Sequence, residues 1–298
     1  MRTCFIVNPN AGSVGEIEVL QEKLGQLQDT EVRFTKKAGD ATAIARRALA
    51  SGAELIVATG GDGTLNEVVN GLAADFGRAR LGLLPLGTGN DFARSINVPA
   101  DLDAALAILA AGRVRTMDVA RAAFGRRRRW FINMSAGGFS GAVSEKATEV
   151  KDRWGPLAYL RAAVGTLPQL QGHDVRVTLD SGERLAVEAY NVVVSNGRFV
   201  AGGIPVAPQS QLDDGWLDLM IAPSATIPQL AVLVPQVLLG RHTESDLLLF
   251  RKAKWIEIQS DPPMSFNLDG ELVGEGPVRF ELKPRALAVV VGAAMDTG

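Results

Sequence analysis

Two glycine-rich turns hold the residues of this 298-residue chain that are best suited to chemistry. Residues 60–64 read GGDGT and follow the apolar run 55–58, and residues 87–91 read GTGND and follow the apolar run 81–84. Glycine lets a ligand approach the backbone closely because it carries no Cβ. Apolar residues recur at helical spacing after the first turn, so we expect strand, turn and helix in succession. The positive end of such a helix is suited to binding phosphate.

Asp62 lies inside the first glycine turn, where a phosphate would otherwise sit. A carboxylate repels bare phosphate, so it needs a cation between them, or else it accepts a proton or a hydroxyl hydrogen bond. The simpler alternative is a tight turn in which the aspartate caps the following helix. The second glycine turn favours a ligand site, because parallel strands bring such turns to one edge of a sheet.

The N-terminal part of the chain alternates between predicted strands and helices. Strands are expected at 3–7, 32–34 and 55–58, with an alanine-rich helix at 41–50 that begins at a capping Asp40. Alternation of this kind is typical of a parallel sheet with right-handed crossovers. We therefore predict a Rossmann-like α/β nucleotide-binding domain at residues 1–125.

The pattern changes from Trp130 onward, where short runs alternate between apolar and polar residues and are separated by turn residues. This pattern predicts an antiparallel β-sandwich. Apolar helices are expected to interrupt it at 157–170 and 227–239. We therefore predict a β-rich substrate domain with helices at residues 126–298. Whether the final run, 287–291, returns as a strand to the first domain is left open by the sequence.

Composition excludes several classes of protein. The net charge of −2 gives no general attraction to nucleic acid. The only cysteine, Cys4, excludes an internal disulfide and favours a reducing compartment. His173 and His242 lack ligand-like neighbours, which argues against a zinc site. Neither a signal peptide nor an apolar run long enough to span a bilayer is visible, so we predict a cytoplasmic protein.

Three further segments allow two interpretations each. Residues 211–219 read QLDDGWLDL, a turn whose oxygen ligands suit Mg²⁺ but which also fits an ordinary Asp-Gly hairpin. Residues 267–271 read NLDGE, in which Asp269 and Glu271 flank a glycine; this pattern also fits a surface hairpin tip. The four arginines at 126–129 fit either a solvated hairpin tip or a patch attracted to anionic lipid headgroups.

The pair of glycine turns, GGDGTLNEVVNGL followed by PLGTGNDFAR, resembles the diacylglycerol-kinase catalytic-domain family. That family includes soluble bacterial lipid kinases, sphingosine kinases and ceramide kinases. The first motif alone is less specific, because NAD kinases and phosphofructokinases carry related turns. NPNAG at 8–12 and DGE at 269–271 extend the resemblance over nearly the whole chain.

The resemblance implies an ATP-dependent lipid kinase that transfers the γ-phosphate of ATP to a lipid hydroxyl in a cleft between two domains. Diacylglycerol is the default acceptor and phosphatidic acid the product. The resemblance also implies the residues around the nucleotide, which are Asn8, Pro9, Asn10, Ala11, Gly12, Thr35, Gly60, Gly61, Asp62, Gly63, Thr64, Leu65, Asn66, Glu67, Gly87, Thr88, Gly89 and Asn90.

The resemblance further implies a structural Mg²⁺ bound by Asp214 and by the backbone carbonyls of Gln211 and Trp216. Glu271 corresponds to the proposed proton acceptor of the bacterial enzymes, whereas the aspartate of the GGDG turn is favoured in sphingosine kinases. We take Glu271 as the base, Asp62 as the residue that organises catalytic Mg²⁺, and Asp269 as a third catalytic residue. AGGI at 201–204 departs from the family's usual three glycines.

Two alternatives remain beside the lipid kinase. An NAD kinase is disfavoured by PLGTGNDFAR and QLDDGWLDL, and a non-catalytic lipid-binding regulatory protein is disfavoured by the intact acidic residues of both halves. The expected partners are ATP and a lipid substrate at the membrane surface, with peripheral membrane association and no nucleic acid. Whether the protein forms a homodimer is left open.

Overall fold

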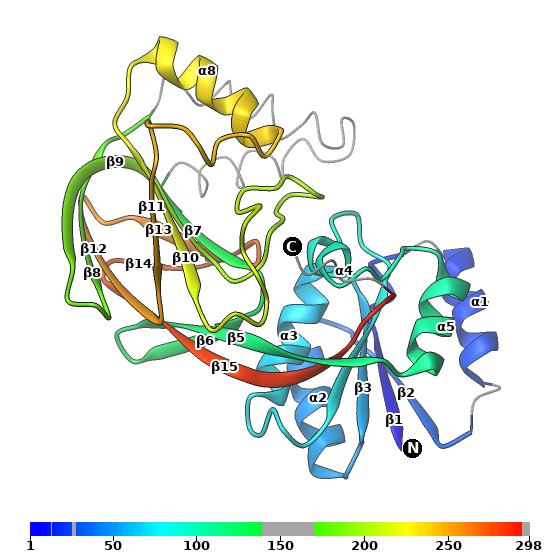
Figure 1. The fold of residues 1–298 in the computed structure, drawn as a ribbon. Coiled ribbons are helices and arrows are strands. Elements are labelled where there is room, and N and C mark those ends of the chain that lie inside the picture. The colour runs from blue at the N-terminus through cyan, green and yellow to red at the C-terminus, as the bar shows by residue number, and fades with distance from the viewer. Residues whose placement is uncertain (13, 26–27, 139–169, 294–298) are drawn as a thin grey trace. The chain divides into compact units, whose positions relative to one another are not determined.

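The computed structural model describes residues 1–12, 14–25, 28–138 and 170–293 (Figure 1). The chain forms two compact units, the first made of Met1–Val119 with Pro284–Gly298 and the second of Ala120–Lys283. The chain therefore passes from one unit to the other twice, once within strand β5 (Val114–Phe124) and once within strand β15 (Val278–Val290).

The first unit is built on a parallel sheet, as predicted. Its strands are β1 (Thr3–Val7), β2 (Thr30–Phe34), β3 (Leu55–Gly60) and β4 (Arg80–Pro85), in the order β4-β3-β1-β2. The last part of β15 adds to the β4 edge, with Val289 opposite Leu81 in parallel register. Every residue of β3 is buried, which is expected of a strand covered by helices on both faces.

Two layers of helices cover this sheet (Figure 1). The helices of the unit are α1 (Val14–Gly25), α2 (Asp40–Ala50), α3 (Asp62–Leu72), α4 (Asp91–Ser95) and α5 (Leu102–Ala111). On one face α2 packs against α3 so closely that a Cβ added to Gly71 would come within 2.5 Å of Ala45. On the other face α1 and α5 lie together, joined by an ion pair between Lys23 and Asp103.

The start of α2 differs from the prediction that Asp40 caps it. The N-cap is Gly39, in the left-handed region at φ 87°, and no side chain caps the helix from that position. The Oδ2 atom of Asp40 instead accepts hydrogen bonds from two N–H groups of the preceding loop, at 2.8 and 3.1 Å. The amides of Gly39 and Ala41 donate to the carboxylate of Glu67 in α3, at 2.8 and 3.0 Å. The predicted cap is therefore wrong, because a distant carboxylate supplies the acceptor.

The second unit is the antiparallel β-sandwich that the sequence predicts. Its remaining strands are β6 (Arg127–Phe131), β7 (Met134–Gly138), β8 (His173–Leu179), β9 (Arg184–Ser195), β10 (Leu217–Pro223), β11 (Leu249–Ala253), β12 (Trp255–Asp261), β13 (Ser265–Leu268) and β14 (Glu271–Glu275). Their described pairings are antiparallel. Helix α8 (Ile227–Leu238) confirms the second predicted helix. The helix predicted at 157–170 lies outside the described residues, except for its last position.

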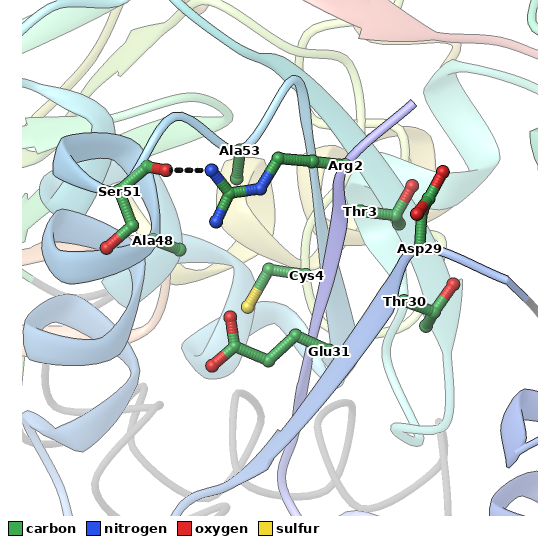
Figure 2. A pocket seen from close by; sticks show the side chains of 9 residues that line it. All are labelled: Arg2, Thr3, Cys4, Asp29, Thr30, Glu31, Ala48, Ser51 and Ala53. Carbon is green, nitrogen blue, oxygen red and sulfur yellow. Dashed lines mark hydrogen bonds between the residues drawn. The ribbon is translucent and has the colours of Figure 1, made fainter.

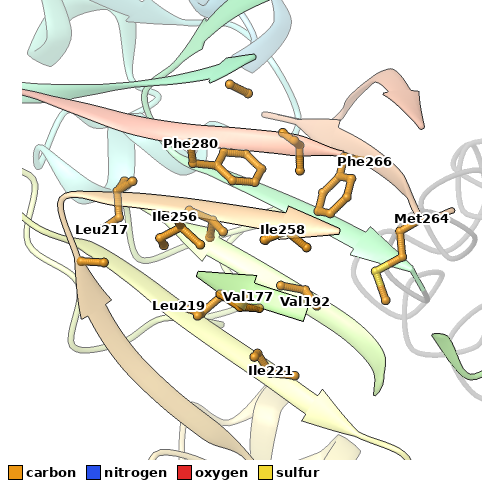
Figure 3. Close-up of a cluster of buried hydrophobic side chains, with 14 of the residues drawn as sticks. Val177, Val192, Leu217, Leu219, Ile221, Ile256, Ile258, Met264, Phe266 and Phe280 are labelled. Carbon is orange, nitrogen blue, oxygen red and sulfur yellow. The ribbon is translucent and has the colours of Figure 1, made fainter. Parts of the chain in front are cut away.

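Alternating burial along the strands builds the core of this unit. Strand β8 buries every second residue, including Val175 and Val177. These side chains meet apolar residues of β9, β10, β12, β13 and β15 in one cluster, with Phe266 and Phe280 at 5.9 Å between ring centroids (Figure 3). Within the described residues, no helix is both long and apolar enough to cross a membrane.

Candidate functional site

The segments that follow the four parallel strands of the first unit lie at one edge of its sheet. Strand β1 leads to Asn8, β2 to Thr35, β3 to Gly61 and β4 to the turn at 86–90. Backbone N–H groups join these segments in three places: Asn8 to the Thr59 carbonyl at 2.9 Å, Thr35 to the Val7 carbonyl at 2.9 Å, and Leu86 to the Gly60 carbonyl at 3.0 Å. In α/β sheets the carboxyl ends of the strands form the ligand edge.

The two glycine turns touch each other at this edge. A Cβ added to Gly87 would lie 2.5 Å from the Cα of Gly61, and a Cβ added to Gly60 would lie 2.6 Å from the hydroxyl of Thr64. Neither position has room for a side chain. Glycine is therefore required at position 87 for the packing of the two turns and at position 60 for the packing of Thr64 within the first turn, in addition to the ligand access expected from the sequence.

Asp62 links the two turns. Its Oδ1 atom accepts a hydrogen bond from the N–H of Asp91 at 3.0 Å, at the start of α4. Burial raises the pKa of Asp62, while the backbone N–H groups of Phe92, Asp91 and Asn90 act in the opposite direction. The carboxylate does not cap α3, whose N-cap is Gly61 without a side-chain hydrogen bond. The structure therefore places a half-buried carboxylate between the two glycine turns.

Other predicted nucleotide residues hold the shape of these loops. Asn8 donates from Nδ2 to the Thr64 hydroxyl at 3.1 Å, and its Oδ1 accepts from the N–H of Asn10 at 3.0 Å. Asn90 closes its own turn by bonding both backbone groups of Gly87, at 3.1 and 2.6 Å. The rest of the predicted set in these same segments comprises Pro9, Ala11, Gly12, Gly63, Thr88 and Gly89.

Three residues of the first motif have other partners in the structure. Leu65 and Asn66 are buried, with 2% and 1% of their surfaces exposed. Glu67 binds the amides at the start of α2. The side chains of these residues therefore stabilise the helices behind the edge, while the residues before them form the edge itself.

Asp269, one of the predicted catalytic residues, accepts hydrogen bonds that hold a hairpin in place. Its Oδ1 accepts from the N–H groups of Asn133 and Met134, both at 3.0 Å, and its Oδ2 accepts from Ile132 at 3.1 Å. Asp269 and Gly270 both have positive φ, at 46° and 90°, and form the turn between β13 and β14. This carboxylate therefore fixes the β13–β14 hairpin to the segment between β6 and β7.

Glu271 is the first residue of β14 and forms an ion pair with Arg129 of β6. The distance from the Arg129 Nη2 atom to the Glu271 Oε2 atom is 2.8 Å, and the two side chains are 34% and 43% exposed. An ion pair this exposed contributes only about 0–1 kcal/mol to stability. Its main effect is to orient a carboxylate that remains open to solvent.

The acidic turn at 211–219 has a cation of its own. The Lys252 ammonium lies 2.7 Å from the Asp214 Oδ2 atom and 3.6 Å from the Asp218 Oδ1 atom. The Asp214 Oδ1 atom accepts from the N–H of Trp216 at 3.0 Å, and burial raises the pKa of Asp218. Across the described ranges, no three His, Cys, Asp or Glu side chains gather as a metal site. The turn that contains Gln211 thus fits Mg²⁺ only if water and backbone carbonyls supply most of the ligands. The ion would also compete with the Lys252 ammonium for the Asp214 carboxylate.

A cavity of roughly 410 Å³, whose lining side chains Figure 2 shows, lies where β1 and β2 begin, at the ends of these strands opposite the glycine turns. Its lining residues are Arg2, Thr3, Cys4, Asp29, Thr30, Glu31, Ala48, Ser51 and Ala53. Arg2 donates to the Ser51 carbonyl at 2.5 Å, and burial raises the pKa of Cys4 to about 11, so the thiol stays protonated. The cavity shares no residue with the predicted site.

Comparison with known proteins finds similarity along the chain. The sequence model of the family "Diacylglycerol kinase catalytic domain" matches residues 2–122, and that of the "YegS C-terminal NAD kinase beta sandwich-like domain" matches residues 133–291. A diacylglycerol kinase of Staphylococcus epidermidis is 36% identical over 284 residues, which is 94% of this chain and 88% of that protein. One of Staphylococcus aureus is 34% identical and covers 94% and 89%.

Solved structures show the same similarity to diacylglycerol kinases. A crystal structure of a diacylglycerol kinase from Bacillus anthracis superposes with a TM-score of 0.75 at 25% identity, covering 98% of this chain and 97% of that one. A second crystal structure from the same organism gives a TM-score of 0.84 at 29% identity, covering 99% and 98%.

Proposed function

Because the chain belongs to the diacylglycerol kinase catalytic-domain family, we propose that it is an ATP-dependent lipid kinase that phosphorylates diacylglycerol to phosphatidic acid. The enzyme would work in the cytoplasm on lipid presented at a membrane surface. The observation that carries the proposal is the contact between the turns at Gly61 and Gly87, which are joined through Asp62 at the ligand edge of a parallel sheet.

The same edge suits the phosphates of ATP. Helix α3 has 11 residues and begins at Asp62, after the N-cap Gly61, so its first amides have no acceptor within the helix and the positive end of the helix dipole lies behind them. Asn8 and Thr64 add polar groups beside these amides. Phosphoryl transfer depends chiefly on such positioning and on charge stabilisation. Asp62 would supply the carboxylate that holds the Mg²⁺ bound with ATP, and this ion would neutralise phosphate charge.

Glu271 is the proposed base. As the lipid oxygen forms its bond to the γ-phosphorus, its O–H bond breaks, the proton passes to the Glu271 carboxylate, and ADP leaves with the electrons of the broken P–O bond. Arg129 binds the Oε2 atom of Glu271, which leaves the Oε1 atom to accept the proton. Asp269 keeps the hairpin that carries Glu271 in place.

NAD is the second candidate acceptor, because the family description of residues 133–291 names an NAD kinase-like sandwich. A direct competition separates the two. With γ-labelled ATP, we expect label in diacylglycerol presented in mixed micelles or vesicles and none in NAD. Thin-layer chromatography and mass spectrometry would identify the product. Labelled NAD with no labelled lipid from a broad panel would exclude the lipid kinase.

A structural Mg²⁺ at Asp214 predicts a measurable link between metal and stability. Metal that binds only the folded state stabilises it by about 2.7 kcal/mol at a hundredfold excess over Kd. We expect the Tm of the wild type to rise with Mg²⁺, and Asp214→Ala to remove that rise. Lys252→Met should enlarge it, because the competing ammonium is gone.

The matched control for this experiment is Asp246→Ala, which removes an exposed aspartate of the same unit. It should keep the wild-type dependence on Mg²⁺ in differential scanning fluorimetry. A Mg²⁺-dependent rise that survives in Asp214→Ala would place the structural metal elsewhere.

A further inference from the structure

We propose that the tip of the β5–β6 hairpin, residues 125–128, docks the protein on an anionic lipid bilayer. The inference rests on the proposed function, in that the acceptor is a membrane lipid, and it adds the surface through which the bilayer is engaged. Of the four arginines at 126–129, it gives a role to the three that the catalytic proposal does not use.

The hairpin presents its arginines to solvent. Strands β5 and β6 pair in antiparallel register, with Phe124 opposite Arg127, and Gly125 turns the chain at φ 56°. Arg126, Arg127 and Arg128 are all exposed. Among the described residues, the ion pairs of this hairpin are made by Arg121 and Arg129 and not by these three.

The charge of the tip is not explained by folding. Residues 120–131 read ARAAFGRRRRWF, with five basic and no acidic residues, in a chain whose net charge is −2. Short hairpins favour Asn-Gly or Asp-Gly at the turn, and adjacent like charges repel one another. An external anion removes this repulsion. Juxtamembrane clusters of Lys and Arg bind anionic lipid in this way.

The position of the tip favours a bilayer over another polyanion such as nucleic acid. Arg129, which binds Glu271, follows Arg127 by two residues on the same face of β6, a rise of roughly 7 Å. Leu272, the residue after Glu271, has 59% of its surface exposed. A bilayer held by the tip would therefore present lipid hydroxyls and an apolar phase next to the proposed base. A nucleic acid has no apolar phase in which the exposed Leu272 side chain could be buried.

Vesicle binding by the full-length chain tests the proposal. The variant R126S/R127S/R128S is compared with R46S/R47S/R78S, which removes the same charge from exposed arginines of the first unit. In co-sedimentation at low salt, we expect the wild type and the control to bind vesicles of phosphatidylcholine mixed with phosphatidylglycerol, and to bind pure phosphatidylcholine far less. The tip variant should bind the anionic vesicles on the order of a hundredfold more weakly.

Activity and stability measurements accompany the binding assay. In neutral detergent micelles, where no anionic surface exists, all three proteins should phosphorylate lipid at the same rate and unfold at the same temperature. A protein that binds anionic vesicles through the tip but labels no lipid would refute the proposed function and leave this inference standing.

Two results would overturn the inference. Equal loss of vesicle binding in the tip variant and the control variant would show that only overall charge matters. Unchanged vesicle binding in the tip variant would show that the tip does not face the bilayer, and a simultaneous loss of RNA binding would assign the patch to nucleic acid.

Discussion

Glu271→Gln is expected to lower kcat at least about a hundredfold, which corresponds to about 2.7 kcal/mol of transition-state stabilisation. A lipid hydroxyl is a poor nucleophile and loses its proton during transfer. Glutamine keeps the shape of the side chain and can still accept from Arg129, but it lacks a basic oxygen. Nucleotide affinity should change little, because the glycine turns are untouched. Steady-state kinetics and ATP titration measure the two quantities separately.

Asp269→Asn is the control for this experiment, because its carboxylate binds three backbone N–H groups and touches no reacting atom in the proposal. Hydrogen bonds to charged groups contribute more than neutral ones, so we expect a loss of roughly 2 kcal/mol or more in unfolding free energy. Glu271→Gln should leave stability nearly unchanged, since its ion pair is half-exposed. A large fall in Tm for Glu271→Gln would mean that its loss of activity reflects folding. Near-wild-type kcat in Glu271→Gln would assign the base elsewhere, with Asp62 as the first candidate.

The sequence was sufficient to predict the ligand edge of the first unit. Each glycine turn directly follows a buried strand, so its place at the carboxyl edge of a parallel sheet follows from local pattern and chain topology. The alternation in the second half was likewise enough to predict the antiparallel sandwich. These features depend on periodicity and on short-range turn chemistry, which a single sequence carries.

The individual roles of the acidic residues depend on contacts between segments that are far apart in the chain. Glu67 binds the start of a helix 26 residues earlier, Asp269 binds amides more than 130 residues earlier, and Asp214 pairs with Lys252, 38 residues later. No local pattern distinguishes a carboxylate that binds backbone amides from one that meets a substrate. Arg129 was noted as part of a run of arginines, but its partner Glu271 lies 142 residues away.

Asp62→Asn should lower turnover without lowering stability, whereas Asp269→Asn should chiefly lower stability. We expect turnover to fall at least about a hundredfold and Mg·ATP to bind more weakly, because a preorganised charge at the phosphates is lost. Asparagine keeps an Oδ1 acceptor for the N–H of Asp91, so the contact between the turns is retained. Loss of turnover with unchanged ATP affinity would instead identify Asp62 as the base and reverse the roles of Asp62 and Glu271.

The raised pKa of Asp62 fixes the sign of the stability change. Below its ordinary value of 3.8 the group is protonated in both the folded and unfolded states, so the charge has no effect. As the pH rises from 3.8 through the raised folded pKa, the unfolded state ionises before the half-buried carboxyl group of the folded state does, so the wild type loses stability and the asparagine variant does not. Asp62→Asn should therefore melt above the wild type at neutral pH, with the difference shrinking toward pH 3.8. A variant that melts below the wild type at neutral pH would show that the three amide donors outweigh burial, and that the carboxylate charge holds the two glycine turns together.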